Sequence, residues 1–150
     1  MRVSIKHSIS ILFVILSLSI NAQEIISPNK KVKVVLNFSE KNAVHHLYYK
    51  VLYKIENKFV EVLPDSKLGI NRTDEQFVDN LDLVATSKSI SVKDKYEMVC
   101  GKRHKCENLG TQKTFSFQNS NHQPLDIVFR VYNDGIAFRY VFPNQSDSKV

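Results

Sequence analysis

Two cysteines, Cys100 and Cys106, are the residues of this chain whose type and spacing most directly suggest chemistry. They are its only cysteines, and the five residues between them include Gly101, so a small closed loop can form. In an oxidising compartment an even cysteine count favours a disulfide, which in a loop this short stabilises the fold by about 2–3 kcal/mol on the chain-entropy model. A metal site that adds His104 is the alternative, but no second ligand pair stands at structural-zinc spacing. The sequence therefore favours a disulfide.

The acidic and histidine residues form no pattern that predicts catalysis. Cleavage of a glycosidic bond needs two carboxylates that face each other across a few ångströms. His45 and His46 are adjacent in a predicted strand, where neighbouring side chains point to opposite faces, so they do not share an ion. Nucleophile-elbow, phosphate-loop and HExxH motifs are also missing from the sequence. No pairing is visible among the acidic residues of the predicted turns and polar segments: Glu56, Glu61, Asp65, Asp74, Glu75 and Asp79.

Residues 1–22 have the pattern of a secretory signal peptide. Arg2 and Lys6 give a positive start, an apolar run of 12 residues follows over 9–20, and Ala22 offers a small residue before cleavage at Gln23. A membrane-spanning helix takes about 20 apolar residues, so an uncleaved anchor is the less favoured alternative. We expect a periplasmic or secreted chain with no membrane contact after the signal is removed.

Length and composition indicate one globular domain. The chain has 150 residues and a formal net charge of +6, and it contains four glycines and four prolines, too few for a low-complexity chain. Its densest basic groups lie at 30–33 and 102–105, without the interleaved aromatics of a groove for single-stranded nucleic acid. We therefore expect no nucleic-acid partner.

The strongest local order lies in residues 125–143, LDIVFRVYNDGIAFRYVFP. Large apolar side chains alternate with other residues along both arms, which is the period of a half-buried strand. Asn133, Asp134 and Gly135 between the arms tolerate positive φ, so they predict a tight hairpin, and Pro143 ends its second strand.

Short strands separated by turns account for the rest of the chain after residue 22. The pattern predicts strands over 31–38, 43–55, 59–63 and 111–118, with one or two more within 81–92. Residues 96–106 are expected to be irregular, and no segment shows a helical period over ten or more residues. The predicted fold class is all-β, an antiparallel β-sandwich built around the 125–143 hairpin.

Several segments in this order resemble the N-terminal domain of glycoside hydrolase family 97. The strongest is VYNDGIAFRY at 131–140, and the resemblance covers roughly residues 23–143. The other segments are SPN at 27–29, which leads into a strand, the strand at 47–54, KLGI at 67–70, and GKR at 101–103 with Asn108 downstream.

The resemblance implies one part of a larger exported enzyme. Members of the family cleave α-glucosidic or α-galactosidic bonds and combine an N-terminal β-supersandwich, a (β/α)8 barrel, a small C-terminal β-domain and a bound calcium ion. Most of the catalytic and calcium-binding groups lie on the barrel or late in the N-terminal domain, so no catalytic residue, calcium ligand or other cofactor carries over to this chain. Residues 23–150 are then expected to form part of the supersandwich, without the barrel and without activity alone.

The same resemblance singles out Lys102, Arg103 and Asn108 as candidates for the rim of the carbohydrate site. They match the GKR-to-Asn segment, which in the family reading is a loop that leans towards the barrel, where arginine offers paired donors. The alternative, favoured because exposed charge is common, is a structural turn with solvated basic residues.

A different function is also consistent with the sequence, namely a stand-alone carbohydrate-binding or adhesion module. Such modules present exposed aromatic side chains for stacking against sugars. The chain has no tryptophan, but Tyr48, Tyr49 and Tyr53 lie close together in one predicted strand.

Overall fold

The structure is a computed structural model that describes residues 23–41, 44–99 and 104–143. This part of the chain consists of strands and their connections. It contains no helix long and apolar enough to cross a membrane. The predicted signal peptide, Cys100, Lys102 and Arg103 lie outside the described residues.

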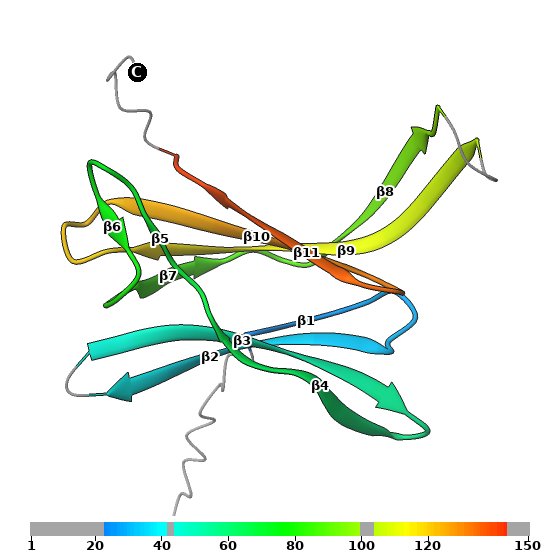
Figure 1. Ribbon diagram of the computed structural model, residues 1–150, viewed down its shortest axis with the longest axis horizontal. Helices are drawn as coiled ribbons and strands as arrows, with labels where there is room; N and C mark the ends of the chain where they lie inside the picture. The colour runs from blue at the N-terminus through cyan, green and yellow to red at the C-terminus, as the bar shows by residue number, and fades with distance from the viewer. Residues whose placement is uncertain (1–22, 42–43, 100–103, 144–150) are drawn as a thin grey trace, which may run out of the picture.

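Two antiparallel sheets pack face to face (Figure 1). The first sheet has the order β1-β2-β3-β4, with β1 at Glu24–Ile26, β2 at Val32–Lys41, β3 at Val44–Ile55 and β4 at Lys58–Lys67. The second has the order β11-β10-β9-β7, with β7 at Asp82–Thr86, β9 at Lys105–Gln118, β10 at Pro124–Tyr132 and β11 at Ile136–Val141. A further strand, β8 at Ile90–Glu97, pairs with β9, and the short strands β5 (Ile70–Asn71) and β6 (Gln76–Phe77) pair with each other. The predicted all-β antiparallel fold is confirmed.

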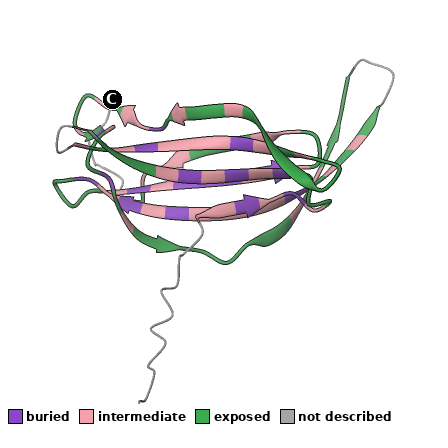
Figure 2. Cartoon of the chain, turned by 90° about the horizontal axis from the view of Figure 1, so that it is seen from below, coloured by how far each residue is buried: buried purple, intermediate pink, exposed green. Residues whose placement is uncertain are grey.

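The hydrophobic core fills the space between the two sheets. Phe115 and Phe129 are fully buried and meet edge to face, with ring centroids 6.1 Å apart. Tyr49 of the first sheet packs on Phe129 at 5.9 Å and joins the sheets. Figure 2 shows the buried residues gathered on the strands that face the other sheet. The largest fully buried apolar side chains are Ile25, Leu47, Leu68, Phe115, Phe117, Leu125, Ile127 and Phe129.

The predicted hairpin at 125–143 is confirmed as β10 and β11, with Phe129 opposite Phe138. Its turn differs from the predicted one, because none of the residues Asn133, Asp134 and Gly135 has a positive φ. The last pair of the ladder is Val131 opposite Ile136, so the connection is longer than a two-residue turn. Only the two-residue turn requires the mirror-image conformation. Here the N–H of Tyr132 donates to the carbonyl of Gly135 at 2.8 Å.

Two strands extend beyond their predicted limits. Residues 58–67 form one strand, β4, that continues through Pro64. Proline is tolerated there because β4 is the edge of its sheet and is bulged where it faces Tyr49 and Leu52. The segment 96–106, expected to be irregular, instead contains the end of β8 and the start of β9. Both faces of that ribbon carry polar residues, which hides the period of a half-buried strand.

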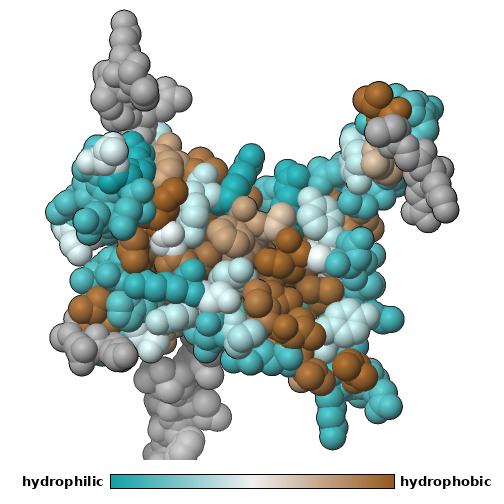
Figure 3. Space-filling view, in the orientation of Figure 1, coloured by the Kyte–Doolittle hydropathy of each residue, from teal (hydrophilic) through white to brown (hydrophobic). Residues whose placement is uncertain are grey.

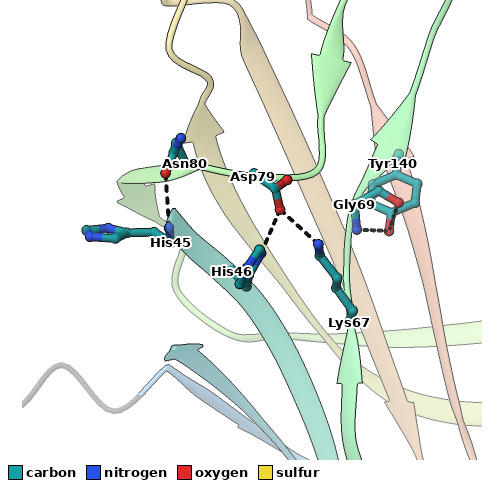
Figure 4. Close-up of polar contacts among 7 residues, drawn as sticks. All are labelled: His45, His46, Lys67, Gly69, Asp79, Asn80 and Tyr140. Carbon is teal, nitrogen blue, oxygen red and sulfur yellow. Dashed lines mark hydrogen bonds and ion pairs between the residues drawn. The ribbon is translucent and has the colours of Figure 1, made fainter. Parts of the chain in front are cut away.

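Gly69 lies where the chain leaves the first sheet after β4, and only glycine fits there. Its φ is 150°, and an added Cβ would stand 2.7 Å from Cα of Val78 and 2.8 Å from the carbonyl oxygen of Phe77. Its N–H donates to the hydroxyl of Tyr140 at 3.0 Å, and that hydroxyl donates back to its carbonyl at 3.3 Å (Figure 4). Burial raises the pKa of Tyr140.

We predict that Gly69→Ala lowers the free energy of unfolding by at least about 2 kcal/mol, because the methyl group meets backbone atoms in a conformation that favours glycine. Gly135→Ala is the matched control, since a Cβ there has no atom within 4 Å, and it should change stability by less than about 0.5 kcal/mol. Urea denaturation of both variants measures the difference. Equal stability of the two variants would contradict the prediction.

Candidate functional site

A two-stranded arm projects from the second sheet (Figure 1). It consists of β8 and the first half of β9, whose second half stays in the sandwich between β7 and β10. Near its tip the N–H of Met98 donates to the carbonyl of His104 at 2.8 Å. One strand therefore belongs to both the core and the arm.

The predicted site residues lie on this arm or in its connection. Asn108 is half-buried in β9 opposite Asp94, and Cys106 is half-buried in β9 opposite Tyr96. Lys102, Arg103 and Cys100 belong to the segment 100–103, outside the described residues. The structure thus places Asn108 and Cys106 on the same face of the arm, and the rim candidates and the Cys100–Cys106 disulfide stay predictions.

The root of the arm is fixed by a carboxylate that binds two side chains from β10. Asp94 accepts hydrogen bonds from Nη1 of Arg130 at 3.0 and 3.2 Å and from the hydroxyl of Tyr132 at 2.6 Å. Nε of Arg130 donates to Gln112 of β9 at 2.8 Å. These contacts join β8, β9 and β10 on the outer face of the second sheet.

Gly110 makes this arrangement possible. It is buried in β9 opposite Tyr132, and an added Cβ would lie 2.9 Å from Cδ1 and Cε1 of that ring. The aromatic ring therefore covers the glycine backbone and reaches across β9 to Asp94 on β8. Covering a strand glycine with an aromatic side chain is a recognised way to stabilise a sheet.

The contacts at the root of the arm keep the phenol of Tyr132 neutral and the guanidinium of Arg130 charged. The hydrogen bond to Asp94 raises the pKa of Tyr132, because ionising the phenol would place two negative charges together. Hydrogen bonding to Tyr132 and the nearby Asp94 raise the pKa of Arg130. The three groups form a neutral phenol beside an ion pair.

Two sequence motifs far apart in the chain meet beside this root. The N–H of Asn29, in the Ser-Pro-Asn turn, donates to Oδ1 of Asn133 at 3.0 Å. Oγ of Ser27 accepts from the N–H of Val32 at 2.9 Å and donates to Oδ1 of Asn29 at 2.7 Å, which shapes the turn. Asn133 follows Tyr132 directly, so the two turns and the arm share one end of the sandwich.

The two faces of the arm differ in chemistry. The face that includes Asp94 also carries Ile90 and Tyr96, which are about half exposed. On the other face Lys93 binds Glu107 at 2.6 Å, and this contact lowers the pKa of Glu107. One face of the arm therefore carries exposed apolar and aromatic side chains beyond its polar root, and the other carries paired charges beside the exposed Leu109.

A second polar cluster ties the start of β3 to the segment before β7 (Figure 4). Asp79 contacts Nδ1 of His46 at 2.6 Å and accepts a hydrogen bond from Nζ of Lys67 at 2.8 Å. The bond from Lys67 is the main cause of the lowered pKa of Asp79. His45 points elsewhere and lies 3.8 Å from Glu40, so the adjacent histidines do not share a site. His46 and Lys67 are thus both bound to Asp79, which gives the cluster a structural role.

The described residues do not bring together a set of metal ligands. Among them, no group of three or more His, Cys, Asp or Glu side chains is close enough to hold a metal ion. Calcium takes six to eight oxygen ligands, many of them from carboxylates, and these residues supply no carboxylate cluster for the ion implied by the family resemblance. The alternative zinc site needs Cys100, which lies outside the described part of the chain.

The three tyrosines of the binding-module hypothesis do not form one surface. Tyr49 is packed between the sheets against Phe129 and Phe138. Tyr48, its neighbour in β3, faces the opposite side, with its ring 6.3 Å from that of His46. Tyr53 lies on the same side of the strand as Tyr49. A shared platform for a sugar ring is therefore missing at these positions.

The family model described as Glycosyl-hydrolase 97 N-terminal matches residues 25–150. The chain belongs to this family. The match includes both turns that meet at Asn29 and Asn133, and also the arm, so the candidate site lies inside the family's own sequence pattern.

Relatives of this family 97 domain are much longer. A protein of Streptomyces bingchenggensis (strain BCW-1) named "Probable retaining alpha-galactosidase" is 32% identical over 85 residues, which is 57% of this chain and 13% of that protein. Two structures of a Glycoside Hydrolase Family 97 enzyme from Pseudoalteromonas sp. strain K8, a variant in complex with panose and the enzyme in complex with acarbose, match 83% of this chain and 18% of theirs. Their TM-scores are 0.65 and 0.64, at 17% and 18% identity, which supports the fold.

Sequence reasoning missed the groups that hold the arm of this family 97 domain. Asp94 lies 36 residues before Arg130, and no local pattern connects them. A partial signal exists, because Arg130 and Tyr132 stand two apart in a strand and so share its outer face. A glycine inside a strand, as at Gly110, also marks a close approach of another group.

We predict that Tyr132→Phe loosens the arm while the sandwich stays folded. Loss of the bond to Asp94 removes about 1.4 kcal/mol from local stability, so the amides of β8 should exchange hydrogen about tenfold faster. Tyr48→Phe, on the outer face of the first sheet, is the control and should leave β8 unchanged. Hydrogen-exchange mass spectrometry measures the exchange of β8 in both variants. Unchanged exchange in β8 of Tyr132→Phe would refute the role of this contact.

Proposed function

We propose that this domain serves an exported glycoside hydrolase, in the periplasm or outside the cell, that cleaves α-glucosidic or α-galactosidic bonds. Membership of the family 97 N-terminal domain supports a hydrolase as the parent protein. The similarity to a protein named as an alpha-galactosidase supports an α-linked sugar substrate. The chain spans 13% of that protein and 18% of the matched structures, so the chemistry is assigned to the longer enzyme.

Within that enzyme the sandwich acts as a rigid base and the arm as its contact with the catalytic domain. The observation that carries this proposal is the root of the arm, where Asp94 is held by Arg130 and Tyr132. A ribbon that only linked two strands would not need an ion pair and a covered glycine at its base. The arm carries Asn108 along its length and has Lys102 and Arg103 in its connecting segment, where they serve as rim residues of the carbohydrate site.

We predict that the isolated chain does not hydrolyse aryl α-glucosides or aryl α-galactosides. Glycosidic cleavage requires a facing pair of carboxylates, and the family resemblance assigns the catalytic groups mainly to the barrel, whereas this chain matches the N-terminal domain. Release of nitrophenol from both substrates, measured against a family enzyme as positive control, tests this. Turnover that survives repurification of the chain would refute the assignment of the chemistry to the longer enzyme.

In the longer enzyme we predict that Arg103→Ala lowers kcat/KM by about tenfold, because one charge-assisted hydrogen bond to the sugar is lost. Lys88→Ala is the matched control, since Lys88 is an exposed basic residue just before β8. It should leave kcat/KM unchanged. Steady-state kinetics of both variants in the longer enzyme provide the measurement. Equal kinetics of the two variants would remove Arg103 from the rim.

A further inference from the structure

The arm separates its charged residues from its uncharged ones. Asp94 lies opposite Asn108 and Tyr96 lies opposite Cys106, so these four residues share one side of the ribbon, called here the Asn108 face. Within β8 and the residues of β9 paired with it, Asp94 is the only charged residue on this face, and its carboxylate is already bound by two side chains of β10. Figure 3 shows hydrophilic and hydrophobic side chains next to each other on the arm, at the upper right of the view. The opposite face carries the other charges of these paired strands: Lys93, Lys95, Glu97, Lys105 and Glu107.

Tyr96 is an aromatic side chain that the Asn108 face leaves half exposed, with an exposed fraction of 49%. Asn108 is half-buried and is its diagonal neighbour, because it stands two positions from Cys106, the residue opposite Tyr96. Diagonal neighbours in an antiparallel pair are about 7–8 Å apart, which is within reach of an aromatic side chain. An exposed ring and a side-chain amide therefore lie side by side on this face.

The arm holds these two side chains at a fixed spacing. β8 pairs with β9 without a break from Ile90 to Glu97, and Asp94 ties β8 to β10 at the root. Residues on paired strands are positioned more precisely than residues on loops. The ring of Tyr96 and the amide of Asn108 are therefore placed relative to each other by the fold itself.

This combination matches the two kinds of surface that a hexose ring presents. The C–H groups on one side of the sugar form an apolar face that stacks on an aromatic ring, whose π-face is negative. The hydroxyl groups around its edge donate and accept hydrogen bonds, and the carboxamide of Asn108 does the same. A neutral hexose also brings no charge onto the face, which avoids the cost of desolvating an unpaired ion.

We propose that Tyr96 stacks on a hexose unit of the substrate that lies beyond the cleaved bond, and that Asn108 binds hydroxyl groups of the same unit. This inference rests on the proposed function, in which the arm reaches the rim of the carbohydrate site of the longer enzyme. It adds Tyr96 to the rim and makes the arm select substrates that have more than one sugar unit. A unit beyond the cleaved bond is assigned because a rim surrounds the reacting centre.

The test compares two substrates of the longer enzyme, an α-linked trisaccharide and the α-hexosyl fluoride of the same sugar, in the glucose and galactose series. The fluoride has no sugar unit beyond the cleaved bond, so it cannot use the proposed contact. Tyr96→Ala should raise KM for the trisaccharide by about tenfold with kcat unchanged, because a contact made equally in the ground state and the transition state is lost. KM for the fluoride should stay the same.

Two further variants identify the cause of the effect. Tyr96→Phe keeps the ring and should keep KM for the trisaccharide within about twofold of the unmodified enzyme. Leu109→Ala is the matched control, because Leu109 is an exposed apolar residue on the other face of the arm, opposite Lys93. It should leave KM for both substrates unchanged. Partial misfolding of a variant would lower kcat for both substrates and would not raise KM for one of them.

The outcomes separate this inference from its rival and from the proposed function. An unchanged KM for the trisaccharide in Tyr96→Ala would overturn the inference. Equal losses on trisaccharide and fluoride would overturn it as well, and would indicate that the ring packs against the catalytic domain. A longer enzyme that hydrolyses neither kind of substrate would overturn the proposed function together with the inference.

Discussion

Burial of one side of β10 is the constraint on which the rest of the structure depends. Ile127, Phe129 and Val131 are fully buried between the sheets, and each such side chain contributes about 1.5–3 kcal/mol relative to exposure. Because side chains alternate along a strand, this burial forces Arg130 and Tyr132 onto the outer face. The packing of the core therefore places the two groups that hold the arm, although neither of them contacts the core.

The sequence predicted those parts of the fold that have a local pattern, and it failed where the decisive contact is distant. The hairpin of β10 and β11 was predicted because its apolar alternation is strong on both arms. The start of β9 was missed because its residues are polar on both faces, and only pairing with β8 makes them a strand. The contact of Asp94 with Arg130 joins residues 36 apart in the chain, so no local pattern links the two.

Two exposed features of this family 97 domain differ in their chemistry and in how firmly they are held. The arm extends away from the sandwich, carries many charges, and is tied to β10 at its base through Asp94. The flank along the edge strand β11 is apolar and continuous with the core, and its exposed Phe138 is already packed on one side.

The continuous ladder between β8 and β9 also constrains how the arm can vary in length. Each residue adds about 3.3 Å to a strand, so inserting two residues in both strands moves the connecting segment outward by roughly 7 Å and keeps every side chain on its face. Inserting one residue in both strands moves every side chain beyond the insertion to the opposite face. Tyr96 would then point to the face that now carries Lys93 and Glu107. Related proteins can therefore tolerate even-numbered changes in reach, whereas odd-numbered changes require a bulge.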